Sequence, residues 1–506
     1  MAIRIYNTMT RTKEELVARD AGKISMYVCG PTVYNFIHIG NARTFLNFDM
    51  IRRYLEYSGY EVTFVQNITD VDDKIINKAG EEGVTPEALA DEYRIAFERD
   101  MAALGVKPPD LAPRATQHID EMLDVIKCLV DKGYAYESEG DVYFEVDKFE
   151  GYGKLSGRTL DEQQHGVASG VDADRKRGPW DFALWKAAKP GEPSWDSPWG
   201  PGRPGWHIEC STMSMKYLGD GFDIHGGGLD LVFPHHENEI AQAEACSGAQ
   251  FVRYWMHSGM LNVDTEKMSK SLGNIKRLRE VLDEYDAQTV RMLMLGTHYR
   301  SPLNFSDESL SDAKASLERI SNARFNIADE VRRKEEWGAS MIRTEAETML
   351  VYFLNDAESE FRAHMDDDFN SAAALGVLFE TVREVNSYIA ETNMLKTPCG
   401  KIVMLEAQRV IDSMCEGLGL FQAAPPALSK DKETVTVQHT ITSGVSIVAP
   451  VEHPTTEELI ELLLATRQVA RQMKNFELSD RIRDGLADIG VRVEDVRDGY
   501  RWRLER

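Results

Sequence analysis

Near the N-terminus, short apolar runs alternate with longer amphipathic stretches. The run at 24–29 is followed by Gly30 and Pro31, which predicts a strand that ends at a break. Residues 41–58 then carry apolar side chains at helical spacing, and residues 60–68 return to strand character. Strand, helix and strand in this order predict a βαβ unit, which implies a parallel sheet with a right-handed crossover.

The alternation is then interrupted. Two helical stretches, a hairpin and a Gly/Pro/Trp-rich region with the character of a loop follow, at 86–104, 113–131, 134–146 and 178–206. Strand and helix patterns resume near Gly205 and continue to about residue 300. The simplest interpretation is a single Rossmann-like parallel sheet within residues 1–300, split by an inserted module at about 115–200.

After residue 300 the pattern becomes helical. Four long amphipathic segments predict a helical bundle over 301–421, with approximate bounds of 306–334, 344–365, 370–392 and 399–418. Residues 422–453 have no helical period and predict a linker or an irregular insert. Residues 454–506 then predict a small C-terminal α+β domain. The predicted fold class is therefore α/β with an inserted module, followed by an α-helical bundle and this small domain.

Composition narrows the class of protein. The chain has 506 residues, of which 42% are hydrophobic and 28% are charged, as is typical of a soluble protein with sizeable cores. It has no apolar run of transmembrane length and no secretory signal at its start, so we expect a cytoplasmic protein without a membrane partner. The six cysteines are scattered, which favours reduced thiols over a disulfide framework.

The net charge of −25 argues against a nucleic-acid partner for the chain as a whole. The tail is different, because residues 453–506 hold 10 Lys and Arg against 11 Asp and Glu. Four arginines stand near the end of this tail, at Arg497, Arg501, Arg503 and Arg506. The sequence therefore places its best candidate for an RNA-facing surface in the C-terminal domain.

Two short motifs carry candidate chemistry. His38-Ile39-Gly40-Asn41 stands where the first strand gives way to the first helix, so its side chains lie beside helix amides that favour phosphate. Lys267-Met268-Ser269-Lys270-Ser271 puts two ammonium groups on a Gly-flanked loop, where they can stabilise negative charge that moves onto pyrophosphate. In this order the motifs resemble the paired signatures of class I aminoacyl-tRNA synthetases. Asn41 departs from the histidine usual there, and an amide can donate a hydrogen bond but carries no charge.

Four side chains offer ligands for a metal. Cys29 ends the first strand, Cys210 begins a probable helix, and His235 and Glu239 stand four residues apart, on one face if that run is helical. Two thiolates, an imidazole and a carboxylate are a sound zinc set. The Cys-x-x-Cys spacing of zinc fingers is absent, however, and a small buried hydrophobe is the ordinary role of an isolated cysteine. The residues alone therefore leave metal binding open.

Longer segments settle which family the chain resembles. CGPTVYNFIHIGNARTF, NITDVDDKII, GWHIECS and HGGGLDLVFPHHENEIAQ resemble cysteinyl-tRNA synthetases, in order and along nearly the whole chain. The resemblance implies one Zn²⁺ per chain, held by Cys29, Cys210, His235 and Glu239. A slip of one residue in register would instead select His236 and Glu237. The implied substrates are L-cysteine, ATP with Mg²⁺, and tRNA(Cys). The sequence does not require an oligomer, so we expect a monomer.

The same resemblance implies a role for each site. It assigns His38 and Asn41 to the triphosphate of ATP, and Lys267 and Lys270 to pyrophosphate. It assigns the adenosine pocket to Gly226, Gly227, Gly228 and Asp230, and a wall of the cysteine pocket to Trp206. It makes residues 454–506 an anticodon-binding domain, with tRNA contacts at Arg497, Arg501, Trp502 and Arg503. Zinc would bind the substrate's sulfur as a thiolate and so distinguish cysteine from serine, without a proofreading domain.

Two rival functions fit parts of the sequence. A related ligase could activate cysteine with zinc and ATP and transfer it to an amino sugar, but such a ligase would need no anticodon-binding tail. A non-catalytic RNA-binding or zinc-structural protein could keep the scaffold. Such a protein would be expected to have lost a pyrophosphate lysine or a metal ligand, and both sets are intact here.

Overall fold

The computed structural model describes residues 2–158, 173–263, 266–267, 276–332, 344–391, 398–421, 464, 467, 476–488, 491–496 and 499–504. The larger of two compact units comprises residues 1–323 and 337–425. Its main sheet has four parallel strands in the order β10-β9-β3-β4. These strands are β3 Lys23–Val28, β4 Glu61–Gln66, β9 Phe222–Gly228 and β10 Val252–Ser258. The predicted βαβ unit and parallel sheet are confirmed.

The order of the strands creates a crevice at the sheet's carboxyl edge. β3 leads through α1 (Ile39–Tyr57) to β4 on one side, whereas β9 leads through α6 (Glu237–Ser247) to β10 on the other. The connections from β3 and β9 therefore lead to opposite sides of the sheet, although the two strands are parallel neighbours that lie far apart in sequence. Ligands of open α/β sheets bind at such a switch point. Cys29 lies there, and its backbone N–H donates to the carbonyl oxygen of Gly226 at 3.1 Å.

α1 is buried along nearly its whole length, because it packs on the sheet and also on α8 (Ala287–Leu295) and α12 (Pro398–Leu418). A helix enclosed in this way needs partners for its charged side chains. Asp49 accepts from Arg53 at 2.8 Å and from Arg291 of α8 at 2.6 Å. Burial alone would raise the pKa of Asp49, but the two guanidinium groups lower it, so the carboxylate stays charged inside the protein.

The inserted module contains an antiparallel sheet in the order β5-β6-β7-β8. Its strands are β5 Ala135–Ser138, β6 Asp141–Phe144, β7 Phe182–Ala187 and β8 Gly202–Pro204, and α4 (Ile119–Asp131) packs beside them. The predicted hairpin is confirmed. The prediction of a loop over 178–206 is wrong, since β7 and β8 lie within it. β7 lies in a Gly/Pro/Trp-rich region and depends on pairing with β6, so its local composition did not reveal it.

Cys128 of α4 and Cys246 of α6 form a disulfide, with Cα atoms 5.8 Å apart. The expectation of reduced thiols is therefore wrong for this pair. Four cysteines are free and buried, namely Cys29, Cys210, Cys399 and Cys415. The bond joins the inserted module to the helix that carries Glu239.

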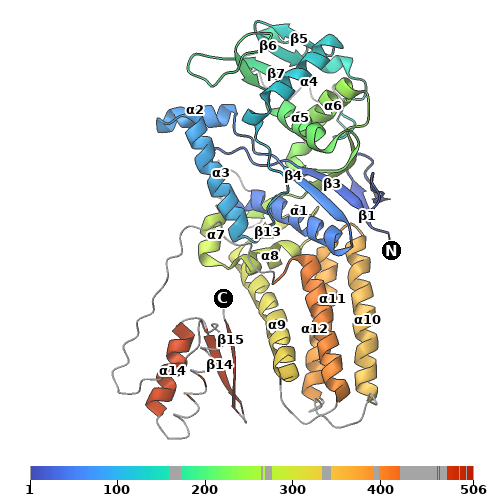
Figure 1. The fold of residues 1–506 in the computed structure, drawn as a ribbon, viewed down its shortest axis with the longest axis vertical. Coiled ribbons are helices and arrows are strands. Elements are labelled where there is room, and N and C mark those ends of the chain that lie inside the picture. Colours follow the sequence, from blue (N-terminus) through green and yellow to red (C-terminus); the bar gives the residue numbers. More distant parts are fainter. Residues whose placement is uncertain are drawn as a thin grey trace, which may run out of the picture. The chain divides into compact units, whose positions relative to one another are not determined.

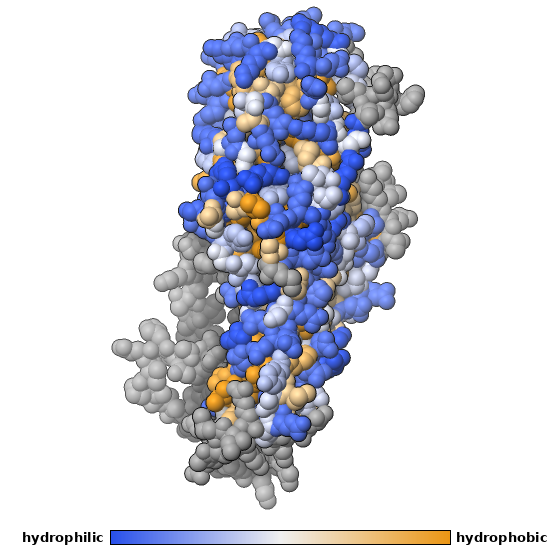
Figure 2. All heavy atoms as spheres, turned by 90° about the vertical axis from the view of Figure 1, so that its right-hand side faces the viewer, coloured by the Kyte–Doolittle hydropathy of each residue, from blue (hydrophilic) through white to orange (hydrophobic). Residues whose placement is uncertain are grey.

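The helices predicted after residue 300 are confirmed. They are α9 Asp307–Arg332, α10 Glu345–Asp366, α11 Ser371–Glu391 and α12 (Figure 1). α10 begins with a capping box, in which Thr344 accepts from the backbone N–H of Glu347 at 3.2 Å and Glu347 accepts from that of Thr344 at 2.7 Å. On the face drawn in Figure 2, hydrophobic residues stand in small groups among hydrophilic ones. No helix among the described residues is both long and apolar enough to cross a bilayer.

The larger unit has further α-helices and strands. They are β1 Arg4–Asn7, β2 Thr12–Glu15, α2 Asp73–Glu82, α3 Pro86–Ala103, α5 Trp206–Leu218, β11 Leu261–Val263, β12 Glu266–Lys267, α7 Leu278–Glu284 and β13 Leu303–Phe305. The described part of the smaller unit consists mainly of α14 Phe476–Asp488 and the antiparallel pair β14 Val491–Val496 and β15 Gly499–Leu504. Residues 422–453 lie outside the described residues. The predicted fold class is confirmed, while the domain boundaries stay predictions.

Candidate active site

His38 and Asn41 form the N-terminal cap of α1. His38 is the N-cap residue, and its Nδ1 accepts from the backbone N–H of Asn41 at 3.2 Å. In return, Oδ1 of Asn41 accepts from the backbone N–H of His38 at 3.4 Å. This reciprocal pair explains how asparagine serves at the position, since its oxygen closes the cap while its amide N–H₂ remains able to donate. The site combines these donors with the positive end of a helix.

The second motif lies largely outside the described residues. Lys267 lies opposite Asn262 in the β11–β12 pair, and Lys270 lies outside the described residues. The residues just beyond the motif are described, and they meet the first motif. The backbone N–H of Ile39 donates to Lys276 at 3.0 Å, and that of Leu278 donates to Ile37 at 3.1 Å. The chain thus brings the base of the second motif to the start of α1.

A cavity of about 660 Å³ lies at this place. Cys29 and Trp206 line it together with His38 and Asn41. Sequence analysis did not assign three charged residues that also line it, namely Lys74, Arg277 and Glu280. Lys74 follows the α2 cap Asp72, and Arg277 begins α7. The NITDVDDKII segment was the signal for Lys74, since it was part of the family resemblance.

Cys29, Cys210, His235 and Glu239 lie together behind one wall of this cavity. Their candidate ligand atoms all fall within 4.8 Å of one another, and all four residues are buried. The two Sγ atoms are 3.7 Å apart, and Nε2 of His235 is 3.0 Å from Oε1 of Glu239. Two sulfurs bound tetrahedrally to one Zn²⁺ at about 2.3 Å would be separated by about 3.8 Å. The donor set therefore fits zinc in both chemistry and spacing.

A second group of ligands overlaps the first. Cys29 and Glu239 also lie within 4.8 Å of His225 and His236. The first group has two thiols instead of one, which suits zinc better. In addition, Nδ1 of His236 lies 2.8 Å from Nε2 of His257, which is outside the group, and Nε2 of His225 lies 2.8 Å from Oε2 of Glu239, which belongs to both groups. These contacts suit residues that orient ligands.

His235 is held in the same manner. Its Nδ1 lies 2.9 Å from Nδ1 of His207, while its Nε2 faces Glu239. Trp206 stacks on the other side, with ring centroids 4.2 Å apart. The imidazole is therefore oriented by a hydrogen bond and by an aromatic face, and Trp206 also borders the cavity.

Burial decides the protonation of this region. It raises the pKa of the Cys29 thiol and of the Glu239 carboxyl well above their usual values. It also lowers the pKa of His207, His225 and His257 to about 3, so these imidazoles are neutral at pH 7. A bound cation reverses the effect on thiols and carboxyls, because it favours their charged forms. Neutral imidazoles and deprotonatable thiols are the states that metal binding requires.

The glycines that end β9 make close contacts with other side chains. A Cβ atom added to Gly226 would lie 2.3 Å from the ring of Phe48, and one added to Gly227 would lie 2.9 Å from His236. A Cβ atom added to Gly228 would lie 2.4 Å from Oδ1 of Asp230, and both of these residues line the cavity. Gly226 and Gly227 therefore allow α1 and His236 to approach the sheet, and Gly228 and Asp230 face the space where a ligand can lie.

The C-terminal residues fall into two groups. Arg501, Trp502 and Arg503 lie on β15, and Arg497 is outside the described residues. Trp502 packs against the small core formed by Leu464, Leu486 and Val491. Because side chains alternate along a strand, Arg501 and Arg503 lie on the face of β15 opposite Trp502.

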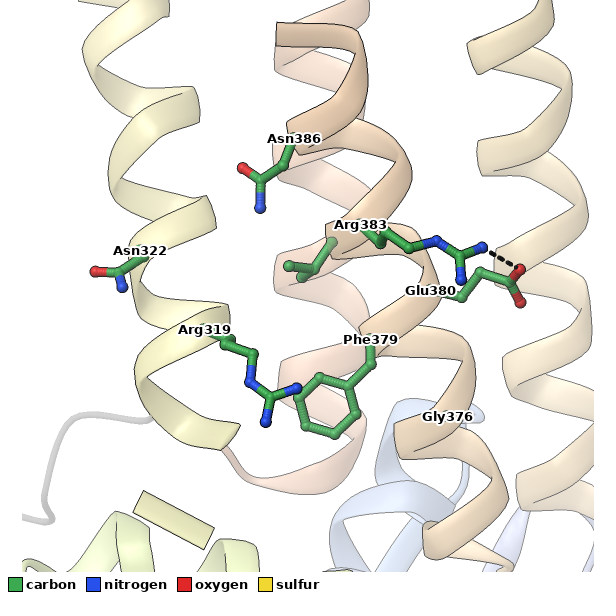
Figure 3. Close-up of a pocket in the computed structure, with 8 residues that line it drawn as sticks. Arg319, Asn322, Gly376, Phe379, Glu380, Arg383 and Asn386 are labelled. Atoms are coloured by element: carbon green, nitrogen blue, oxygen red, sulfur yellow. Dashed lines mark hydrogen bonds and ion pairs between the residues drawn. The ribbon is translucent and has the colours of Figure 1, made fainter. Parts of the chain in front are cut away.

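A cavity of about 710 Å³ lies in the bundle, between α9 and α11 (Figure 3). Arg319 points at the ring of Phe379, and Arg383 pairs with Glu380 at 2.9 Å. None of its described lining residues is a cysteine or a histidine. The candidate chemistry therefore lies at the sheet edge and not in this larger cavity.

Three regions of the chain match models of known families. Residues 15–315 match a family model described as the tRNA synthetases class I (C) catalytic domain. Residues 360–422 match a DALR domain, and residues 453–503 match a cysteinyl-tRNA ligase anticodon binding domain. Each match covers a different region of the chain, and together they follow the order of the predicted regions.

Whole-chain relatives and a solved structure point the same way. A cysteine–tRNA ligase of Geobacter sulfurreducens is 50% identical over 505 residues, with both chains covered completely. One from Pelobacter propionicus is 50% identical over 510 residues, also with complete coverage. A methionyl-tRNA synthetase of Mycobacterium tuberculosis, solved with methionyl-adenylate, is 17% identical and shares the fold, with a TM-score of 0.60 over 78% of this chain and 89% of that one. The chain belongs to the cysteine–tRNA ligase family of class I aminoacyl-tRNA synthetases.

Proposed function

We propose that this protein activates L-cysteine with ATP and transfers it to tRNA(Cys), and that it recognises the substrate's sulfur at a zinc ion. The observation that carries the proposal is the position of Cys29. It belongs to a buried set of two thiols, an imidazole and a carboxylate, and it also lines the cavity at the start of α1. A sulfur-binding centre and a phosphate-binding helix end thus face one space.

Four residues would hold the ion, namely Cys29, Cys210, His235 and Glu239. When bound, Zn²⁺ supplies a soft Lewis acid that prefers a thiolate to the hydroxyl of serine. Trp206 borders the cysteine pocket from the side of His235. This preference is needed because the shape of an apolar pocket discriminates between near-isosteres, such as cysteine and serine, by only about 100-fold.

In the first step the cysteine carboxylate attacks the α-phosphorus of ATP, and pyrophosphate leaves with Mg²⁺. Positioning and charge stabilisation carry most of such a step. His38 and Asn41 donate to the triphosphate from the start of α1, while Gly228 and Asp230 border the adenosine. Lys267 and Lys270 neutralise the departing pyrophosphate. In the second step a ribose hydroxyl at the end of tRNA attacks the adenylate's carbonyl carbon, and AMP leaves.

The match of residues 453–503 to an anticodon binding domain supports tRNA over an amino sugar as the acceptor. Arg497, Arg501 and Arg503 would contact the RNA. Trp502 would serve the domain mainly through its packing on Leu486 and Val491. Arginines suit this role because they pair with phosphates and stack on unpaired bases.

The test compares the intact protein with Cys210→Ser, measuring bound metal and cysteine-dependent ATP–pyrophosphate exchange on the same samples. We expect about one zinc per intact chain, and loss of both metal and exchange in the variant. Cys415→Ser is a matched control, because Cys415 is also buried and free but belongs to the bundle. Intact protein that lacks zinc and still activates cysteine in preference to serine would overturn the zinc proposal.

A further inference from the structure

A second cavity, of about 460 Å³, lies behind the first. The two share Asp230, and the segment 228–233 separates them. Gly228 and Leu231 face the first cavity, while Leu229 and Phe233 face the second. A molecule in the second cavity would therefore lie one short stretch of chain away from the place where the adenylate forms.

Three arginines give the second cavity an unusual charge for so acidic a chain. Arg11, Arg158 and Arg300 line it, and Asp230 is the one acidic residue among its described lining residues. Arg300 is paired with Asp368, at 2.7 Å from Nε. Arg11 and Arg158 are exposed, and the described residues offer neither an acidic partner within 4.0 Å. Two guanidinium groups are thus available to an anion.

Two aromatic rings stand beside these arginines. The guanidinium of Arg158 lies 4.9 Å from the ring centre of Phe233, and that of Arg300 lies 4.3 Å from the ring centre of Tyr6. Tyr6 and Phe233 are both half-buried, so part of each ring remains open. Arginines that follow a phosphate backbone, combined with rings on which bases stack, are the usual means of binding single-stranded nucleic acid.

The backbone is shaped to hold one of these arginines. Arg11 has a φ of 59°, in the left-handed region that non-glycine residues rarely adopt. Its guanidinium lies against Gly157, where a Cβ atom would come within 1.6 Å of Nη2. Gly157 itself has a φ of 69°. The turn before β2 and the turn before Arg158 therefore fit together around the Arg11 guanidinium.

We propose that this second cavity, defined by Arg11, Arg158, Arg300, Tyr6 and Phe233, binds the single-stranded 3′ end of tRNA during transfer. The inference rests on the proposed function, because it requires tRNA as the acceptor. The reacting ribose hydroxyl must reach the carbonyl of an adenylate in the first cavity. A 3′ end held by its phosphates in the second cavity would reach that carbonyl across Asp230.

The experiment measures two reactions on the full chain carrying Arg11→Gln, Arg158→Gln or both. Pyrophosphate exchange without tRNA reports activation, and aminoacylation reports transfer. We expect exchange within about twofold of the unsubstituted protein, and kcat/KM for tRNA lowered about tenfold or more by each substitution, as for a lost charge-assisted hydrogen bond. Arg158→Lys, which keeps the charge, should recover part of the loss. Arg99→Gln is the control, because Arg99 is exposed on α3 and lines neither cavity.

A second probe locates the contact on the RNA. Binding of intact tRNA is compared with binding of the same tRNA lacking its last three nucleotides. The double substitution should weaken binding of the intact RNA and leave binding of the truncated RNA unchanged. Equal weakening of both, normal transfer by the double variant, or a parallel loss of exchange would each overturn the proposal. Absence of exchange in the unsubstituted protein would instead refute the proposed function.

Discussion

The cavity of about 660 Å³ at the start of α1 has two ends that are built in opposite ways, with the candidate metal ligands at one end and the His38–Asn41 cap at the other. At the metal end, every candidate ligand is buried, and the four come from three separate stretches of sequence. Their partners are further imidazoles, such as the half-buried His207 and the buried His225. At the phosphate end, His38 and Asn41 are neighbours in sequence, lie near solvent and are held mainly by each other.

The difference follows from what each end has to bind. A small ion needs several donors at fixed distances, so its ligands must be held in advance by packing and by hydrogen bonds. A triphosphate brings its own charge and many oxygens, so a helix end with a few donors can serve, and cations from a loop can complete the site. We therefore expect substitutions at the metal end to be severe and substitutions at the cap to be mild.

The largest expected effect separates the two overlapping ligand groups. His235→Ala should remove zinc and lower cysteine-dependent exchange by more than about 100-fold, since it deletes a ligand. His236→Ala, at the neighbouring buried position, should retain about one zinc per chain when the metal is supplied in excess. Metal analysis of both variants after gel filtration checks this. The opposite result would assign the ion to His225 and His236.

A smaller effect is expected one layer away from the ligands. His207 contacts Nδ1 of His235 at 2.9 Å and belongs to neither ligand group. His207→Ala should weaken zinc affinity by about 10–100-fold without changing the stoichiometry at saturation. Competition with a chelator of known affinity measures the change. His207→Asn, which keeps a hydrogen-bonding group, should restore part of it, and unchanged affinity in the alanine variant would show that His235 needs no such support.

The smallest effect is expected at the cap. Asn41→Ala removes the side chain that accepts from the His38 backbone, while His38 can still cap the helix from its own side. Losing one side of a cap costs about 0.5–2 kcal/mol, so we expect KM for ATP to rise by a few-fold to about 30-fold. KM for cysteine should change little. Steady-state exchange kinetics with each substrate varied in turn measures both, and Asn41→His should behave like the unsubstituted protein.

Sequence patterns were sufficient for the elements whose signal is local. α1 and the four bundle helices have long apolar periods, and their observed bounds differ from the predicted ones by at most two residues. β7 and β8 were missed because they lie in a Gly/Pro/Trp-rich region and acquire their strand character from pairing with β6 and with each other. The burial of α1 on both sides was also not predictable, since it depends on contacts with α8 and α12, which lie far along the chain.

The candidate site also combines residues that local sequence patterns predict with residues that only the fold brings together. Residues alone suggested His38 and the lysine motif, because helix starts and basic loops have local signatures. The grouping of Cys29 with Cys210, His235 and Glu239 came from the family resemblance, since no spacing rule joins positions so far apart. The partners His207, His225 and His257 were not predicted, and neither was Arg277. Each of them acts through a contact that exists only after the chain has folded.

The pairing of β3 with β9, which lie far apart in sequence, has a consequence for synthesis of the protein. Cys29 leaves the ribosome early, Cys210 follows after α1 and the inserted module, and His235 and Glu239 emerge only after β9 has been made. A nascent chain therefore displays one ligand long before it can close a metal site, and loading of zinc has to wait for the second half of the sheet. The disulfide between Cys128 and Cys246 can likewise form only after β9 and most of α6 have been made. A chain that ends before β9 lacks His235 and Glu239, so we expect it to bind no metal at this site.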